Sequence, residues 1–432
     1  MGTTAFARRA LLLVPSIFCI FASTSVQAAE QRLTMAQAIE YSLQNNGDLK
    51  SFRDEKGVRD AGKVRAGLLP NPSLEIEVGT GALTGSSAEN SLSLGVSQEF
   101  FLAGKREKRL AIADRELEMY RWQLADQERV LREGVQTAFY DVVLVEKRHA
   151  LADRYISLNR QLLEVTRERL TAGDIPELEM NLVKVELARS EGAKIDIEKA
   201  LRQNQANLWT LMGLPLGEYP AIVGGFDGKL PMTMNLMGMK QLAHEMRPDI
   251  KALAAEKSRG ESDVILAQAE GIPDLTAGLA VMRDATSIEV GGLEGKDTAY
   301  TIGLKFSMPL PVFNKNQAGV QEARAKRSST ESRLLAASRN IEREVETAYA
   351  SYLNSKDVLS LYETSIVPQL EENLKLSLEA YRLGEVGIVA VIQEQKKFFE
   401  VSEGYLAALH ARQISLVKLE SSVASELTGG VQ

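Results

Sequence analysis

The chain is built from two halves that follow one plan, and this internal repeat limits the possible folds more than any single motif. Residues 33–215 and 236–428 share short motifs in the same order: Asp48-Leu49, Glu55-Lys56, Pro72 and Leu74 recur as Asp249-Ile250, Glu256-Lys257, Pro273 and Leu275, and the turn at Gly173 recurs at Gly384. The pattern predicts a tandem duplication of a unit of helix, two strands, long helix, turn and helix. We expect repeats at 29–215 and 236–428, a connection at 216–235 and a tail at 429–432.

The first 28 residues have the features of a secretory signal. Arg8 and Arg9 precede an apolar run from Ala10 to Ala22, and the small residue Ala28 marks the expected cleavage site. The only cysteine, Cys19, lies inside that run after the bulky Phe18, where a lipoprotein signal requires a small residue. We therefore expect an exported mature chain that carries no thiol and no N-terminal lipid.

Composition favours long helices and argues against binding to nucleic acid. The formal net charge is −7 and only 6% of residues are aromatic. Binding to a phosphate backbone requires a concentrated basic face, and this acidic chain shows none.

Two tracts with little or no proline are predicted to be very long helices, at about 105–171 and 316–383. Apolar residues in the first tract alternate steps of three and four, as in coiled coils, in two groups with one phase slip between them: Leu110, Ala113, Leu117, Tyr120 and Leu124, then Val135, Ala138, Val142 and Val145. A helix of this length spans about 100 Å. Pro368 interrupts the second tract and could mark a domain break, but helical spacing resumes at Leu370 and Leu374, which favours a kink.

Two pairs of segments with alternating apolar residues precede the long helices. We predict strands at about 73–81, 91–100, 274–282 and 299–308, with polar loops from Thr80 to Asn90 and from Arg283 to Asp297. Their length and pattern are typical of strands that cross an outer membrane. Four strands cannot close a barrel, and an open sheet edge cannot lie in lipid. Three copies would supply twelve strands, so we expect a homotrimer.

The turn sequences carry a family resemblance. Arg169 to Glu179 (RLTAGDIPELE) and its counterpart Tyr381 to Gly387 (YRLGEVG), within a duplicated exported chain, resemble the TolC-type outer membrane factors. The strand exit Met308 to Gln317 (MPLPVFNKNQ) is similar to that of the CzcC-like branch, which serves cobalt, zinc and cadmium efflux.

The resemblance implies a mainly α fold with a small β part: a trimeric twelve-stranded barrel in the outer membrane, continued by a long α-helical barrel into the periplasm. It also implies a passive channel with no enzymatic activity and no cofactor. The expected partners are a periplasmic adaptor and an inner-membrane pump of the resistance-nodulation-division class.

By the same resemblance, the two helix-turn tips are the expected docking sites for the adaptor. They comprise Ala172, Gly173, Asp174, Ile175, Leu383, Gly384, Glu385 and Val386. The alternative is an ordinary turn exposed to water. Gly173 and Gly384 are predicted to supply positive φ where two antiparallel helices reverse.

The predicted periplasmic gate departs from the family pattern. Relatives often have carboxylates six and nine residues after the second tip glycine, but here these positions are Ala390 and Gln393. We expect Glu179, Gln393 and Glu394 to lie at the mouth. The alternative for both glutamates is a solvated helix face.

Other candidate sites carry weaker signals. Met232, Met234, Met237 and Met239 could bind a soft metal ion, although methionines also fill irregular packing gaps. The three histidines, His149, His244 and His410, show no metal-ligand spacing. The glycines from Gly79 to Gly85 precede no helix of the kind that a phosphate loop requires.

Two alternative functions stay open at this point. A channel of the same architecture could serve drugs, other organic compounds or type I protein secretion. A periplasmic coiled-coil scaffold without a pore would instead lack strands altogether.

Overall fold

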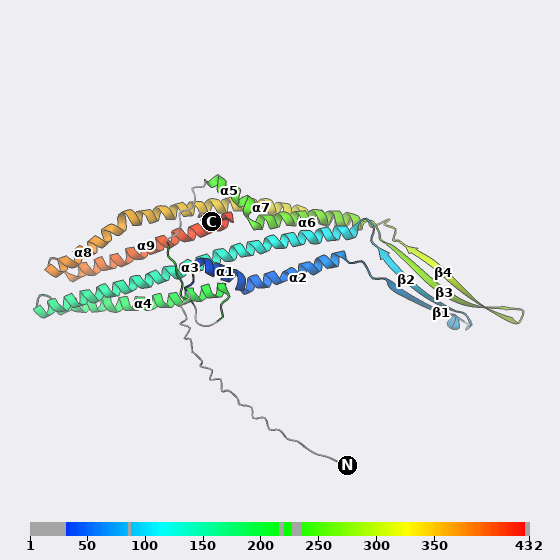
Figure 1. The fold of residues 1–432 in the computed structure, drawn as a ribbon, viewed down its shortest axis with the longest axis horizontal. Coiled ribbons are helices and arrows are strands. Elements are labelled where there is room, and N and C mark those ends of the chain that lie inside the picture. Colours follow the sequence, from blue (N-terminus) through cyan, green and yellow to red (C-terminus); the bar gives the residue numbers. More distant parts are fainter. Residues whose placement is uncertain (1–31, 85–87, 216–219, 227–234, 428–432) are drawn as a thin grey trace, which may run out of the picture.

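The chain folds into an elongated molecule with a β-sheet at one end and long helical hairpins at the other (Figure 1). The computed structural model describes residues 32–84, 88–215, 220–226 and 235–427. The expected signal segment with Cys19 and the expected tail at 429–432 lie outside these residues. Within the described ranges, no helix is long and apolar enough to cross a membrane.

The elements appear twice in the same order. The first half contains α1 (Met35–Asn45), α2 (Gly47–Gly67), β1 (Ser73–Thr80), the short 3-10 helix Ala82–Thr84, β2 (Asn90–Phe100), α3 (Lys105–Ala172) and α4 (Glu177–Met212). The second half contains α5 (Leu236–Met246), α6 (Pro248–Glu270), β3 (Leu275–Val290), β4 (Leu293–Ser307), α7 (Gln317–Leu361), a π-helical turn (Tyr362–Ile366), α8 (Val367–Leu383) and α9 (Ile388–Val423).

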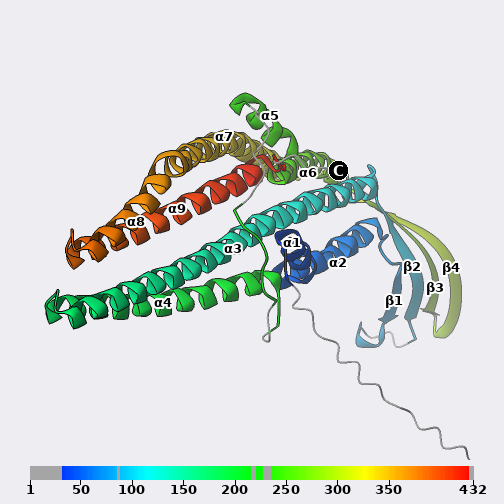
Figure 2. The ribbon, with the colours of Figure 1, turned by 60° about the vertical axis from the view of Figure 1, so that its left-hand side comes forward.

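The long helix α3 agrees with the coiled-coil pattern. Its predicted apolar positions are buried, except Leu110 and Leu124, which are half-buried. Helix α3 packs against α4 over its distal half and against α2, α6 and α9 elsewhere (Figure 2). Burial of this stripe, rather than intrinsic helix propensity, stabilises so long a helix.

Pro368 produces a kink, as its sequence context predicts, through a wide turn. The N–H of Val367 bonds to the carbonyl of Tyr362, five residues earlier, and the helix bends there (Figure 2). Proline at 368 has no N–H to offer the carbonyl of Thr364, so a regular α-turn would leave that bond unmade. Gly404 of α9 accommodates the bulge, since a Cβ at this position would lie only 2.5 Å from the Tyr362 hydroxyl.

The sheet is antiparallel with strand order β1-β2-β3-β4. Cross-strand pairing aligns mainly apolar side chains on one face in three rows, with Arg283 as the charged exception: Leu74, Val96, Leu279 and Leu304; Ile76, Leu94, Val281 and Ile302; then Val78, Leu92, Arg283 and Tyr300. Most of these side chains are about half exposed or more in the single chain. The opposite face carries small and polar residues, among them Glu75, Ser97 and Lys305.

The prediction of a loop from Arg283 to Asp297 was wrong. The ladder between β3 and β4 continues through that segment to the pair Val290 and Leu293. Gly291 and Gly292 make the turn, with φ of 61° and 87°, which matches a two-residue hairpin that needs positive φ at both positions. The strands in this stretch were not predicted, because polar residues interrupt the apolar alternation on which the prediction depended.

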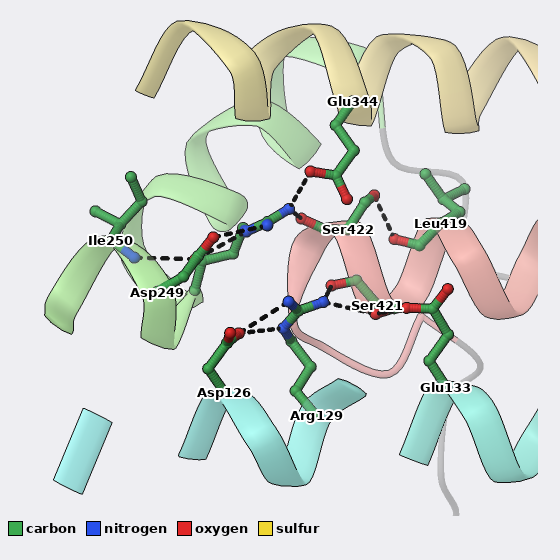
Figure 3. A network of polar contacts seen from close by, with 10 residues as sticks. Asp126, Arg129, Glu133, Asp249, Ile250, Glu344, Leu419, Ser421 and Ser422 are labelled. Atoms are coloured by element: carbon green, nitrogen blue, oxygen red, sulfur yellow. Dashed lines mark hydrogen bonds and ion pairs between the residues drawn. The ribbon is translucent and has the colours of Figure 1, made fainter. Parts of the chain in front are cut away.

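A polar network fastens the end of α9 to both halves of the chain (Figure 3). Arg247, which is 5% exposed, pairs with Asp249 at 2.8 Å and Glu344 at 2.8 Å, and donates to the carbonyl of Ser422 at 3.1 Å. Arg129 of α3 donates to the carbonyl and hydroxyl of Ser421. In the first half, the Asn46 side chain donates to the carbonyl of Leu211 near the end of α4, so both repeats tie down the second helix of their hairpin.

Candidate functional site at the tips of the helical hairpins

The two hairpin tips have the same backbone geometry. Gly173 and Gly384 have φ of 83° and 78°, as predicted. Asp174 N–H bonds to the Arg169 carbonyl and Glu385 N–H to the Ala380 carbonyl, which closes each helix end. A Cβ at Gly173 would meet nothing within 4 Å, so the glycine is required there for its conformation rather than for space.

The tips expose a mixture of apolar and charged side chains. Among the residues predicted for docking, Ala172, Gly173, Asp174, Leu383, Gly384 and Glu385 are exposed and Val386 is half-buried. Ile175 is only 9% exposed and supports the turn from inside. Leu178 and Val389 are 66% and 53% exposed, although the sequence did not single them out. Their position in the first turn after each tip was the available signal.

Tyr381 joins the two hairpins just above the tips. Its hydroxyl lies 3.3 Å from Thr166 and 3.3 Å from Glu179, and its carbonyl accepts from Arg169 at 2.9 Å. The Arg169 guanidinium also lies 4.8 Å from the centre of the Tyr381 ring. Burial raises the pKa of the Tyr381 hydroxyl, which keeps it a hydrogen-bond donor.

The hydrogen bonds at Tyr381 form a shared arrangement. Thr166 donates its own proton to the Leu162 carbonyl at 2.7 Å. The single proton of Tyr381 therefore serves both Thr166 and Glu179, which fits the two long distances. Tyr381 thus links α8 to α3 and to the start of α4.

The structure separates the three predicted gate residues. Glu179 is half-buried and bonded to Tyr381, whereas Gln393 is exposed on α9. Glu394 is half-buried, and its Oε1 has no hydrogen-bond partner among the described residues. In this same part of the chain no hydrogen bond connects Glu179 with either α9 residue, so the acidic and amide groups do not form one cluster in the single chain.

A fully buried amide lies farther along α9. Gln395 is 0% exposed, and neither its Nε2 nor its Oε1 has a partner in the described part of the chain. One turn on, Phe399 stacks on Tyr155 of α3 at 4.8 Å. The sequence reasoning missed this residue, because a lone glutamine on a helix gives no signal of burial.

The two described methionines of the predicted cluster lie in different environments. Met232 and Met234 lie outside the described residues. Met237 is 75% exposed, while Met239 is 2% exposed and packs in a hydrophobic core with Ile341 and Val345. Among the described residues, no group of three His, Cys, Asp or Glu side chains is placed to hold a metal ion.

Each histidine instead pairs with a carboxylate. His410 lies 2.7 Å from Asp141, His244 lies 3.1 Å from Glu342, and His149 lies 3.5 Å from Glu198. All three pairs connect different helices, which supports a structural role.

Comparison with known proteins agrees with this architecture. A profile of the family described as outer membrane efflux protein matches residues 38–214 and again residues 240–425, one stretch in each half. The chain belongs to the outer membrane efflux protein family. The TolC-type resemblance of its turns is thereby confirmed.

This outer membrane efflux protein is similar to two named relatives. It is 22% identical to the cobalt-zinc-cadmium resistance protein CzcC of Cupriavidus metallidurans, over 87% of this chain and 86% of the relative. It is 24% identical to the pyoverdine export outer membrane protein OpmQ of Pseudomonas aeruginosa, over 82% of this chain and 73% of the relative. The resemblance to the CzcC-like branch is therefore also seen across most of the chain.

Solved structures share the fold of this outer membrane efflux protein. CusC superposes with a TM-score of 0.75 at 17% identity, covering 98% of this chain and 99% of that one. The open state of the MtrE outer membrane channel of Neisseria gonorrhoeae superposes with a TM-score of 0.71 at 17% identity, covering 91% and 89%. The mainly helical fold with a small sheet is thus common to these proteins.

Proposed function

We propose that this protein is the outer membrane channel of a tripartite efflux system of the resistance-nodulation-division class. The observation that carries the proposal is the open sheet. Its four strands align apolar rows on one face and small or polar residues on the other. Lipid can cover the apolar face, but the backbone groups at the edges of β1 and β4 need partners.

Three identical copies satisfy that need. Pairing of β4 with β1 of the next copy closes a barrel of twelve strands, an even number of the kind that outer membrane barrels use. The same symmetry places three pairs of long hairpins around one axis as a periplasmic tunnel. The sheet end then lies in the outer membrane and the tips point toward the inner membrane.

The tips dock with a periplasmic adaptor in this proposal. Leu383, Leu178 and Val389 provide exposed apolar contacts, and Asp174 and Glu385 provide charge around them. Such an apolar centre with a polar surround is typical of protein interfaces. Ile175 maintains the shape of the turn rather than contacting the partner.

Conduction is passive, and the pump supplies the energy. The mouth is held by the contacts of Tyr381 with Glu179 and Thr166, so loosening them opens the tunnel. Gln393 faces the mouth from α9 without the acidic ring found in many relatives.

We propose divalent heavy-metal cations as the cargo. Similarity to CzcC over most of both chains supports this assignment, and Glu75 and Glu77 place carboxylates on the face of the sheet that would line the pore. Organic compounds are the second candidate, favoured by the similarity to OpmQ.

Two experiments test the proposal at separate levels. Purified protein should form a trimer in detergent and conduct ions in planar lipid bilayers; a monomer, or a trimer without conductance, would refute the channel. When zinc, cobalt, cadmium, nickel, copper and silver are tested in turn, a deletion strain should lose resistance to at least one divalent metal. Unchanged tolerance to all six, with lost tolerance to dyes or drugs, would assign the cargo to the second candidate.

A further inference from the structure

The connection between β4 and α7 presents three exposed apolar side chains that the single chain does not use. Leu310, Val312 and Phe313 are 79%, 68% and 92% exposed. We call these three residues the foot. Isolated exposed apolar residues need no explanation, but three within four positions, next to a membrane-type sheet, do.

The foot is held in a defined shape. The Asn314 carboxamide oxygen accepts from Asn316 N–H at 2.9 Å, and Gln317 donates to the Phe313 carbonyl at 3.2 Å. Asn316 adopts a left-handed conformation with φ of 57° and donates to the Ala267 carbonyl of α6 at 2.8 Å. These bonds fix both the loop and its position on the end of α6.

The close approach of Gly271 shows how tightly the loop is seated. A Cβ at Gly271 would lie 2.5 Å from the Lys315 carbonyl oxygen, so only glycine permits this contact. The Lys315 carbonyl and the Asn316 side chain thus face the protein, whereas the three apolar side chains of the foot are exposed.

The first repeat lacks this feature. Its corresponding connection, residues 101–104, is shorter than residues 308–316, and its residues other than Gly104 are half-buried. Arg109 lies 4.6 Å from the centre of the Phe101 ring, and Leu102 N–H bonds to Asp274 at 2.9 Å. The connection in the second repeat is therefore longer, and its apolar side chains are exposed instead of packed against the protein.

The foot continues the apolar face of β4. Exposed residues on this face are Tyr300, Ile302, Leu304 and Phe306, and the same alternation extends past the strand through Met308 to Leu310. The foot therefore lies where the apolar band of the sheet ends on the helical side. Lys315 follows it and is exposed.

We propose that the foot inserts into the periplasm-facing leaflet of the outer membrane. Leu310, Val312 and Phe313 contact phospholipid acyl chains near the headgroups, and Lys315 extends toward the phosphates, as lysine does at such boundaries. This inference rests on the proposed function, because it requires the sheet to lie in the membrane. The foot would set the depth of the barrel from the second repeat alone.

Depth-dependent fluorescence quenching tests the foot. Phe313→Trp, and separately Leu304→Trp in the middle of the sheet, are reconstituted into phosphatidylethanolamine and phosphatidylglycerol vesicles with bromine either near the headgroup or near the acyl-chain end. The unsubstituted protein, with its native Trp122 and Trp209, gives the baseline. We expect the introduced fluorescence at 313 to be quenched at least about twofold more by the shallow bromine, since interfacial groups sit only about 5–10 Å deep. At 304 the deep bromine should quench more.

The outcomes separate the two proposals. Quenching at 304 but not at 313 overturns the foot and leaves the channel intact, whereas no quenching at either position refutes membrane insertion of the sheet and the foot with it. If Phe313→Trp fails to fold, Val312→Trp replaces it.

A neighbouring copy could instead cover the foot. Leu68 and Leu69, before β1, are 61% and 64% exposed and would lie at the same level in a closed barrel. A disulfide between Leu69→Cys of one copy and Phe313→Cys of the next, formed in intact cells, would overturn the lipid contact.

Discussion

The Tyr381 hydroxyl contacts Glu179 at 3.3 Å across the two helical hairpins, at a level just above both tips. Because Thr166 lies at the same distance on the other side, one proton ties α8 to α3 and α4 together. Tyr381 is 1% exposed, so water does not compete for these contacts.

Removal of this hydroxyl should loosen the mouth. Tyr381→Phe keeps the ring and the contact with Arg169 but loses hydrogen bonds that contribute about 1 kcal/mol each. We expect a larger single-channel conductance in planar bilayers and a small fall in melting temperature. Tyr352→Phe, in the core between α7 and α9, is the control and should leave conductance unchanged. Equal conductance of Tyr381→Phe and the unsubstituted protein would show that the Tyr381 hydroxyl does not hold the mouth closed.

Two buried glutamines on α9 should respond in opposite directions to the same substitution. In the described part of the chain Gln395 has no partner for either amide atom. Gln413 lacks a partner for its Oε1 only, because its Nε2 donates to the Tyr140 hydroxyl at 2.8 Å. Gln395→Met should raise the free energy of unfolding by about 1 kcal/mol, and Gln413→Met should lower it by about 1 kcal/mol, since an unmade buried bond is costly and a made one is stabilising. Thermal melts followed by circular dichroism would measure both. Destabilisation by Gln395→Met would show that this amide is satisfied in solution.

Arg247 should be among the most sensitive positions in the fold. Arg247→Met leaves the Asp249 and Glu344 carboxylates and the Ser422 carbonyl without their buried partner. The two carboxylates are 31% and 52% exposed, so water can solvate them. We therefore expect a loss of about 1.5–3 kcal/mol, as for hydrogen bonds to a charged group. Arg247→Lys should recover only part of the loss, because an ammonium cannot make the paired contact with Asp249. The melting temperature of the helical signal is the measurement. A shift no larger than that of Arg154→Met, which removes an exposed ion pair with Glu371, would contradict the assigned role.

The same network predicts that the stability of the protein falls at acidic pH. Burial opposes ionisation of Asp249, but hydrogen bonds from Arg247 outweigh it and lower the pKa of this carboxyl. A lowered pKa contributes stability above the ordinary value of about 3.9, and this contribution is lost as the pH falls below it. The unsubstituted protein should therefore lose more stability below about pH 4 than Asp249→Asn does. Parallel curves for the two proteins would contradict the prediction.

The buried hydroxyl of Tyr140 leads us to expect that the stability of the protein falls at alkaline pH. Burial raises the pKa of its hydroxyl to about 12. The unfolded chain releases this proton near pH 10, so the stability contribution of Tyr140 is complete below pH 10 and falls as the pH approaches about 12. Tyr140→Phe should show a shallower loss of melting temperature over that range. Tyr300→Phe, on the exposed face of β4, is the control and should follow the unsubstituted protein.

Periodicity in the sequence was enough to predict the main elements. The helix predicted at 105–171 is observed at Lys105–Ala172. Its apolar residues recur at coiled-coil spacing from Leu110 to Val145, and no proline interrupts the rest of the tract. The glycines at 173 and 384 were recognisable because a reversal between antiparallel helices needs positive φ. These features depend on local pattern, which a sequence displays directly.

Features that depend on distant partners could not be predicted in the same way. The hydrogen bonds of the Tyr381 hydroxyl join residues about two hundred positions apart, and in the sequence this tyrosine resembles any other core residue of a coiled coil. In the sequence Arg247 resembles an ordinary surface charge, because its contacts with α7 and the end of α9 are made only in the folded chain. The distal part of the β3–β4 hairpin was missed because its pairing is made by backbone groups whatever the side chains are.

The wide turn at Tyr362–Ile366 has a consequence for every side chain that follows it. A π-turn holds one residue more than an α-turn, and one residue corresponds to about 100° of rotation around a helix. Deleting a single residue from this segment would rotate Tyr381 to a different side of the helix, away from Thr166 and Glu179. The direction in which the hairpin tip points around the helix axis is therefore set about five turns before the tip, in a bulge for which Gly404 leaves room.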